Sequence, residues 1–517
     1  MKTNQKIKQL IAVTVSAAAG AQFALPAVAA DDTNTPAQVP AYAADANGGG
    51  AESQAEEIRE LKSEVDSLVK KVNQLEKQQT ASQPVAQQAT IDNLDQQVRI
   101  LERERENDNA DAEALAKAQP KFSVGSSGFS AMSSDSNFVF NLKGIVQVDD
   151  RTFFNKNVAQ GADSFLLRRA RPIFQGTLYK DFDFQFTPDF GGSSVQIFDA
   201  YGNYKFAPWL QIRGGKFKTP IGLEQLQADA NTSFNERSLV TDLVPNRDIG
   251  FQLWGDIDDG LASYAIGAFN GVGDARNSSN QDFDNHREIV ARFFTQPFKP
   301  LDIPALNNFG VGIAGGFGNV TSNATDLTSG YTTDGQQSFF TYNPTSGSVV
   351  ADGDHWRISP QGYYYYGPLS LMAEYVVDDQ KVRKSATVAN DLQNTAWEIT
   401  GGWVLTGENA SYNGVIPLHP FDLQSGRWGA FQVVARYAQL DLDKNTFPTY
   451  ANPLTSASEA RAWSVGLNWY LNKNIRINAS FSHTGFSGGG VTPGTTAPAN
   501  VTRQAEEVLF TRVQFAF

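Results

Sequence analysis

The stretch Arg461-Ala-Trp-Ser-Val-Gly-Leu-Asn-Trp-Tyr-Leu471 alternates apolar and polar side chains with a period of two. One face carries Trp463, Val465, Leu467, Trp469 and Leu471, and the other carries Ser464, Gly466 and Asn468. A strand of about ten residues with this pattern is typical of a wall that meets lipid on one side and water on the other. The stretch therefore predicts one strand of a transmembrane β-barrel.

The same alternation recurs in the neighbouring segments 431–437, 475–481 and 509–517, and it begins near Phe138. Counting such segments gives about sixteen, an even number as single-chain outer-membrane barrels require. A soluble β-sandwich or propeller would need apolar inward faces, where this chain places Arg, Asn and Ser. We therefore predict an all-β transmembrane barrel of about 16 antiparallel strands over residues 138–517.

The connections between the predicted strands differ in length. The tight ones are 180–181, 206–209, 258–260, 366–368 and 471–474, and the long polar ones are 150–164, 271–286, 319–354, 379–394, 441–460 and 485–503. Short turns on one side and long loops on the other are expected of such barrels. Residues 297–307 and 407–426 are too long for the short side, and their composition assigns them no role.

The composition excludes several classes of protein. The chain has 517 residues, 41% of them hydrophobic, with no Cys and a formal net charge of -13. Its mean hydropathy is -0.34, and the mature chain lacks the apolar run of about 18 residues that a helical membrane bundle needs. The absence of Cys excludes disulfides. The acidic total disfavours binding of nucleic acid through a basic surface.

The sequence gives no sign of catalysis. Its four His residues lie in or beside predicted loops, and none has metal-ligand spacing to another. No motif of an activated nucleophile is present. We therefore predict that the protein is not an enzyme and requires no cofactor or metal.

The first 30 residues have the pattern of a secretory signal peptide. A basic start with Lys2, Lys6 and Lys8 precedes an apolar stretch from 10 to 25, and Ala27-Val-Ala29 offers a cleavage site. Residues 31–50 are rich in Ala, Asp, Asn and Gly and are predicted to be a linker.

A heptad pattern follows the linker. Its apolar residues are Ile58, Leu61, Val65, Leu68, Val72 and Leu75, and after Pro84 the spacing resumes with Ile91, Leu94, Val98 and Leu101. We predict a periplasmic α-helical coiled coil over 51–118 and a linker over 119–137. A single amphipathic helix is the alternative. Ile or Val at a with Leu at d favours two-stranded coils, and a trimeric barrel would have to override that preference.

Candidate pore residues gather between Phe165 and Gly250. Alternation places Arg169 and Arg171 on the inward face of the second strand, and Arg168 joins them only if the strand has a bulge. In the fifth strand Arg213 faces inward, and a bulge at Gly214-Gly215 would let Lys216 and Lys218 do the same.

The polar segment 219–248 is too long and too charged to be a simple turn. We predict that it folds back into the lumen and narrows the pore. It adds Arg237 and Arg247 together with several carboxylates, and the fourth strand adds Asp199. Arg and Lys inside a pore favour anions. The alternative is that these cations neutralise the acidic loop or form trimer contacts.

Several motifs of this region resemble the bacterial phosphate-selective porin family, the O and P type porins. They are Arg168-Arg-Ala-Arg171, 176–183 (GTLYKDFD), Phe198-Asp-Ala-Tyr201, 216–224 (KFKTPIGLE) and Asn235-Glu-Arg237, with a second set at 405–408 and 412–415. The resemblance covers roughly residues 138–517. It implies a homotrimer of sixteen-stranded outer-membrane barrels that pass phosphate or related anions by diffusion.

In the phosphate-selective members, paired Arg, an Asp, and a Lys, two Ser and an Arg of the inserted loop form the central site. The resemblance places Arg168, Arg169, Asp199 and Arg237 at matching positions. The chain departs from the family at the lysine position, Gln225, and at the serine positions, Ala228 and Asp229. Losing a cation and gaining a carboxylate weakens the binding of a dianion, and Arg171 offsets this in part.

Three functions stay open from the sequence. The first is an outer-membrane diffusion porin that prefers phosphate, polyphosphate or similar anions. The second is a general or sugar porin with Tyr201, Tyr204 and Phe234 as a stacking path. The third is an envelope tether that reaches the cell wall through the coiled coil. The expected partners are small anions or other small solutes, outer-membrane lipid and two further copies of the chain, and nucleic acid is not among them.

Overall fold

The computed structural model describes residue 59 and residues 62–75, 86–154, 161–192, 194–275, 277–279, 282, 284–321, 330–343, 349–385, 387–490 and 502–517. The chain divides into two compact units, Met1–Pro120 and Lys121–Phe517. The predicted signal peptide over 1–30 and the linker over 31–50 lie outside the described residues. So do Ile58 and Leu61 of the heptad pattern.

The first unit contains a helix across 62–75 and the long helix α3 (Ala86–Ala118). Val65 and Ile91 are buried, with 9% and 8% of their surface exposed. Leu68 and Val72 are half-buried, whereas the side chains between the heptad positions of 62–75 are exposed. The helices predicted for this region are therefore present, and their association as a coiled coil stays a prediction. None of the described helices combines the length and the apolar character needed to cross a membrane.

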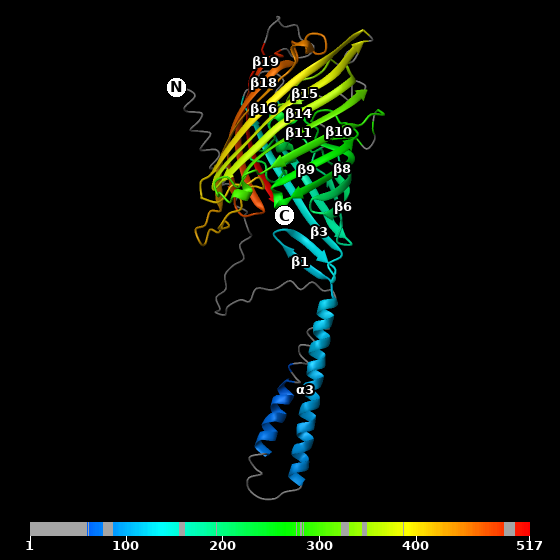
Figure 1. Cartoon of the computed structure of the whole chain (residues 1–517). Helices are drawn as coiled ribbons and strands as arrows, with labels where there is room; N and C mark the ends of the chain where they lie inside the picture. Colours follow the sequence, from blue (N-terminus) through cyan, green and yellow to red (C-terminus); the bar gives the residue numbers. More distant parts are fainter. Residues whose placement is uncertain are drawn as a thin grey trace. The chain divides into compact units, whose positions relative to one another are not determined.

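The second unit is a closed antiparallel barrel (Figure 1). Its sheet has 18 strands, of which sixteen form the wall and the other two, β1 and β2, form a hairpin. The strands are β3 (Val139–Phe153), β4 (Ser164–Leu178), β5 (Phe182–Asp189), β6 (Gln196–Ala207), β7 (Leu210–Lys218), β8 (Arg247–Ile257), β9 (Ala262–Phe269), β10 (Glu288–Thr295), β11 (Phe309–Thr321), β14 (Val350–Tyr366), β15 (Leu369–Ser385), β16 (Val388–Val404), β17 (Ala430–Asp441), β18 (Ala457–Tyr470), β19 (Ile475–Gly488) and β20 (Glu506–Ala516). Pairing of β20 with β3 closes the ring, with Gln514 opposite Gln147. The predicted barrel and strand number are confirmed.

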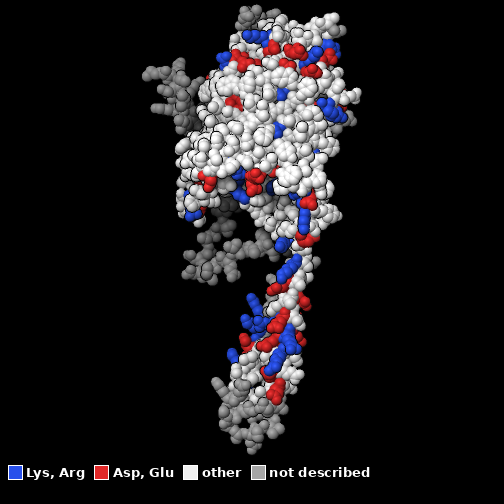
Figure 2. Space-filling model, in the orientation of Figure 1, with Lys and Arg blue, Asp and Glu red and all other residues white. Residues whose placement is uncertain are grey.

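The two faces of the wall follow the alternation in the sequence. Trp463, Val465 and Leu467 of β18 are more than one-third exposed, whereas Ser464 and Asn468 are buried inside the barrel. On the face seen in Figure 2, charged residues gather at the two ends of the barrel and are sparse in the band between them. Such a band fits the hydrocarbon layer of a bilayer.

The connections differ from the prediction at 379–394, which we expected to be a long loop. β15 runs to Ser385 and β16 begins at Val388, so only residues 386–387 separate the two strands. Both faces of this extension carry polar residues, as at Gln380, which is buried, and Lys381, which is exposed. The alternation ends because the strands continue past the lipid into water, where neither face needs to be apolar.

The segment 119–137 is not a simple linker. It contains a hairpin of β1 (Lys121–Gly125) and β2 (Gly128–Met132), and β2 pairs with the start of β3, with Phe129 opposite Leu142. The strands are short, with Gly and Ser between them, and this composition concealed them in the sequence.

Two segments fold into the lumen, as predicted for the first of them, and part of a third connection reaches it. The inserted segment, residues 219–246, contains α4 (Leu223–Leu226) and the turn η1 (Leu239–Leu243). A hairpin of β12 (Tyr331–Thr332) and β13 (Ser338–Phe340) reaches the wall, where Asp334 accepts hydrogen bonds from β17, β18 and β19. The long connection 405–429 brings the Tyr412 hydroxyl to the Leu223 carbonyl, 2.6 Å away.

The remaining short helical turns lie in connections between strands. They are η2 (Asp258–Gly260), η3 (Lys299–Leu301) and η4 (Lys444–Thr446).

Candidate pore constriction

The inserted segment lies against one part of the barrel wall. Its backbone carbonyls between residues 229 and 236 accept hydrogen bonds from inward side chains of β3 and β17–β20. The donor and acceptor pairs are Gln147–Asp229, Gln514–Ala230, Arg476–Thr232, Asn468–Ser233, Arg512–Asn235 and Arg436–Glu236. Because a buried carbonyl without a donor is costly, this series of bonds fixes the path of the segment.

The Glu236 carboxylate joins three strands to the inserted segment. It accepts from Arg168 of β4 at 2.6 and 2.9 Å, from Arg151 of β3 at 3.3 Å and from Arg512 of β20 at 3.2 Å. Burial opposes ionisation of Glu236, but the charge and hydrogen bonds of Arg168 outweigh it and hold the pKa of Glu236 far below its usual range. The ionised form of Glu236 is therefore strongly favoured.

The beginning of the inserted segment is also fixed. Glu374 of β15 accepts the backbone N–H groups of Leu223 and Glu224, at 2.8 and 3.2 Å. Lys218, at the end of β7, donates to the carbonyls of Gln225 and Gln227, each at 2.7 Å. These bonds satisfy groups at both ends of α4, which is too short to satisfy them itself.

A β-bulge in β4 brings three arginines to the lumen. Gln147 pairs with Arg169 but Val148 pairs with Leu167, so Arg168 is the extra residue. The bulge required by the sequence is therefore present. Gly191 packs against it, because a Cβ there would lie 2.8 Å from the Arg168 carbonyl oxygen.

A cavity of about 370 Å³ lies between β4, the connection after β5 and the inserted segment. Five of the nine predicted pore residues line it: Arg168, Arg169, Arg171, Arg237 and Arg247. Gln225 and Asp229, two of the positions that depart from the family pattern, line it as well. Gln225 donates to the Asn246 side chain.

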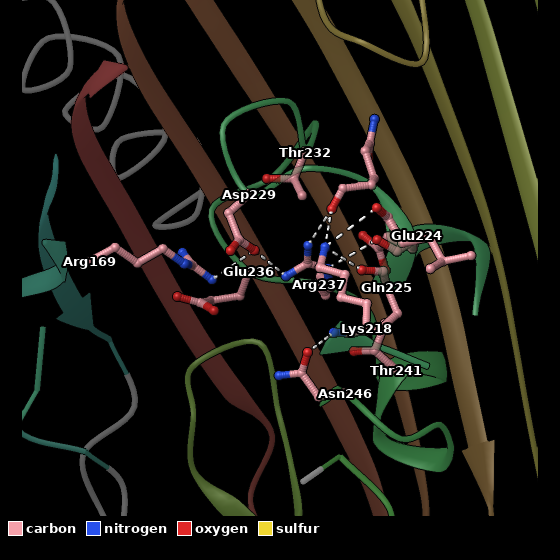
Figure 3. Close-up of polar contacts among 12 residues, drawn as sticks. Arg169, Lys218, Glu224, Gln225, Asp229, Thr232, Glu236, Arg237, Thr241 and Asn246 are labelled. Atoms are coloured by element: carbon pink, nitrogen blue, oxygen red, sulfur yellow. Dashed lines mark hydrogen bonds and ion pairs between the residues drawn. The ribbon is translucent and has the colours of Figure 1, made fainter. Parts of the chain in front are cut away.

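Asp229 lies among three of these guanidinium groups. Figure 3 shows it between those of Arg169 and Arg237. Its Oδ1 accepts from Arg237 at 2.6 Å and lies 3.6 Å from Arg169, and its Oδ2 pairs with Arg171. Burial opposes ionisation of Asp229, but the charges of Arg169, Arg237 and Arg171 outweigh it and hold the pKa of Asp229 well below its usual range.

Each guanidinium that lines the cavity has a carboxylate partner. Arg168 pairs with Glu236, and Arg169 and Arg237 pair with Asp229. Arg171 pairs with both Asp229 and Asp189, at 2.6 Å from the latter, and Arg247 pairs with Asp199 at 3.2 Å. The five positive charges therefore face four paired carboxylates, so the cavity is close to charge balance.

The other four predicted pore residues lie outside the lining of this cavity. Asp199 accepts from Arg247, and Lys216 donates to the Ser278 carbonyl at 2.6 Å. Arg213 lies over the rings of Tyr201 and Trp254, at 4.6 and 4.7 Å from their centres. Lys218 holds the inserted segment, as described above.

The β-bulge expected at Gly214-Gly215 is absent. β7 pairs with β6 without a register shift from Lys216 to Gln211. Instead the backbone of Gly215 takes a φ of 132°, and a Cβ there would lie 2.3 Å from the Ala200 carbonyl oxygen. A glycine tolerates this conformation, and the pairing continues without an extra residue.

The stacking path expected for a sugar is not assembled. Tyr204 packs against Phe182 and Phe206, which are 50% and 63% exposed on the outer face of the wall. Phe234 is buried under the Arg436 guanidinium, 4.5 Å from the ring centre. Strand parity predicts the outward position of Tyr204, since Asp199 and Asn203 face inward.

Sequence reasoning missed the wall residues that hold the inserted segment. Arg512 is fully buried and forms two bonds with Asp149, at 2.6 and 2.7 Å. Arg436 bonds Glu224 and Asp334, at 3.1 and 2.8 Å. The alternation of the strands places both side chains inside the barrel. The sequence does not connect them with their partners, because Glu224 lies 212 residues from Arg436 and Asp149 lies 363 residues from Arg512.

One group among the described residues has the geometry to hold a metal ion. Ligand atoms of Asp274, His355 and Asp378 lie within 4.8 Å of one another. Arg357 already binds both carboxylates, at 2.8 Å from Asp274 and 3.1 Å from Asp378. The group is therefore a buried ion-pair network, and its members come from separate segments that sequence spacing could not connect.

Comparison with known proteins identifies the family of the chain. The family described as phosphate-selective porin O and P matches residues 140–517. Porin O of Pseudomonas aeruginosa (strain PAO1) is 25% identical over 387 residues, which cover 68% of this chain and 84% of that protein.

Solved structures of outer-membrane channels are similar in fold. The channel DcaP of Acinetobacter baumannii matches 74% of this chain and 98% of its own, with 10% identity and a TM-score of 0.49. An anion-selective porin from Comamonas acidovorans matches 74% of this chain and 100% of its own, with 12% identity and a TM-score of 0.46.

The family match covers the whole sixteen-stranded barrel, including the bulged strand and the inserted segment. The chain thus belongs to the phosphate-selective porin O and P family, and it is a porin of the bacterial outer membrane and not an enzyme.

Proposed function

We propose that this porin is a diffusion path for small anions such as phosphate or polyphosphate, narrowed by the inserted segment. The observation that supports the proposal is the convergence of five guanidinium groups on one cavity of about 370 Å³. Arginine is always charged at physiological pH and presents a planar set of donors to oxyanions. Charged side chains at a constriction select ions of the opposite sign.

We also propose that the barrel works as a homotrimer, the assembly implied by the family resemblance. In this proposal residues 51–118 form a coiled coil in the periplasm that extends toward the cell wall. The heptad spacing of the apolar residues in the helix 62–75 and in α3 supports self-association. The remaining Arg and Lys residues predicted for the anion path, Arg213, Lys216 and Lys218, support the path indirectly by shaping the lumen.

Planar-bilayer recordings of the purified protein test the anion preference. Under a KCl gradient, the reversal potential is expected to lie on the anion side. The double variant Arg169→Ala and Arg237→Ala is expected to lose that preference, because it removes charge from the cavity. Arg383→Ala is the matched control, since Arg383 forms a half-exposed pair with Asp352 outside the cavity.

Two results would contradict the proposal. Equal reversal potentials in the double variant and the wild type would remove the cavity arginines from selection. Block by linear oligosaccharides without any ion preference would favour a sugar porin on the same fold.

A further inference from the structure

We propose that Asp229 is a tethered anion that occupies the anion-binding site of the constriction, and that it keeps the affinity for multivalent oxyanions low. The inference rests on the proposed anion path and adds the residue that sets its specificity. It makes Asp229 a competitor of the solute, because a free anion must displace the carboxylate to reach the same arginines.

The contacts of Asp229 are those expected of a bound oxyanion. Both carboxylate oxygens are used: Oδ1 for Arg237 at 2.6 Å and Arg169 at 3.6 Å, and Oδ2 for Arg171. Two of the guanidiniums come from β4 and the third from the inserted segment itself. Convergence of guanidinium groups on one set of oxygens is the usual way in which proteins recognise phosphate and carboxylate.

The backbone places the carboxylate at this point and holds it there. The Asp229 carbonyl accepts from Gln147, and the next carbonyl, of Ala230, accepts from Gln514. Only 8% of the Asp229 side chain is exposed. The carboxylate is therefore presented to the arginines by a fixed main chain and does not need to be recruited from a mobile loop.

The local charge balance supports the role of a competitor. Arg169, Arg171 and Arg237 carry three positive charges, and Asp189 and Asp229 carry two negative ones. With Asp229 in place the site has one net positive charge and matches a monoanion. Without that carboxylate it would have two, which match a dianion such as phosphate or sulfate.

Tethering explains why a free anion competes poorly. A group held by a short linker acts at an effective concentration of about millimolar or more. A free oxyanion must exceed that concentration or bind the arginines more tightly than a carboxylate does. We therefore expect brief occupancy and fast passage of multivalent oxyanions.

The test measures block of the KCl current through single channels by sulfate, which stays a dianion across the pH range used. In Asp229→Ser the sulfate concentration for half-block is expected to fall about tenfold, because one opposing charge is removed at contact distance. Asp229→Asn, with nearly the same shape, is expected to give the same shift and replaces the Ser variant if that variant does not fold. Asp229→Glu is expected to restore weak block.

Asp352→Asn is the control for net charge, because Asp352 pairs with Arg383 outside the cavity. It is expected to leave the half-block concentration unchanged. An unchanged half-block concentration in Asp229→Ser and Asp229→Asn, with the wild type still anion-preferring, would overturn the role of Asp229 alone. A wild type without anion preference would instead overturn the proposed function.

Discussion

Arg168 donates two hydrogen bonds to Glu236, from Nε to Oε1 at 2.6 Å and from a terminal nitrogen to Oε2 at 2.9 Å. Arg168 is also the extra residue of the bulge in β4. One side chain thus links the irregularity of the wall to the segment that narrows the pore. Strand alternation alone would direct Arg168 to lipid, where an unpaired guanidinium is costly.

Glu236→Gln is expected to lower the free energy of unfolding by about 3–5 kcal/mol, because it leaves the buried Arg151 and Arg512 and the part-buried Arg168 without their shared charge. Thermal unfolding in detergent, followed by circular dichroism, measures the change. Asp183→Asn is the control, since Asp183 forms a partly exposed pair with Lys205 that contributes about 0–1 kcal/mol. Equal losses of unfolding free energy in both variants would show that Glu236 contributes no more to stability than a partly exposed ion pair does.

Gly191→Ala is expected to displace the bulge and reduce anion preference, because its Cβ would lie 2.8 Å from the Arg168 carbonyl oxygen and 2.9 Å from the Arg169 Cα. The reversal potential under a KCl gradient measures the effect. Gly202→Ala is the matched control, since a Cβ at Gly202 has nothing within 4 Å. An unchanged reversal potential in Gly191→Ala would mean that the bulge tolerates the methyl group.

Asp242→Asn is expected to stabilise the protein at neutral pH. Burial raises the pKa of Asp242 well above its usual value, and the backbone N–H of Thr332 offsets this only in part. Between the unfolded and the raised folded pKa, the unfolded chain releases this proton and the folded chain keeps it, so Asp242 costs stability as the pH rises. Melting temperatures from pH 4 to 7 should therefore fall less steeply in the variant than in the wild type. Parallel curves would contradict this.

Deletion of residues 51–118 is expected to leave the single-channel conductance unchanged, because the sixteen strands and the inserted segment lie within 139–516. The proposed coiled coil predicts weaker self-association, measured by sedimentation in detergent, and weaker attachment of the outer membrane. A deletion variant with intact trimers and envelope would leave the coil without its proposed role.

The sequence predicts the barrel well because one face of each strand meets lipid and the other meets water. Trp463 and Ser464 are neighbours on opposite faces, and this difference is local. Parity also predicts that Arg168 needs a bulge, which the structure contains. The prediction of a long loop at 379–394 is wrong, because β15 continues to Ser385. The strands extend beyond the lipid there, so their outer face no longer needs to be apolar.

The pore constriction is less predictable, because its charge balance depends on ion pairs between residues that are far apart in the sequence. The sequence identifies Arg169, Arg171 and Arg237 as cavity residues and notes Asp229 as a departure from the family pattern. It does not show that Asp229 lies among all three guanidiniums, since a loop can place its carboxylate in many ways. Lys218, predicted for the pore, binds carbonyls of the inserted segment instead.

The ring closes between its first strand and its last, where the Gln147 and Gln514 side chains bond across 367 residues. Without the C-terminal strand, both margins of the sheet would expose unsatisfied main-chain groups that a bilayer does not tolerate. Glu236 bridges arginines from either side of this seam. The inserted segment therefore also holds the first and last strands together. A protein without the final strand should form neither a closed barrel nor a channel.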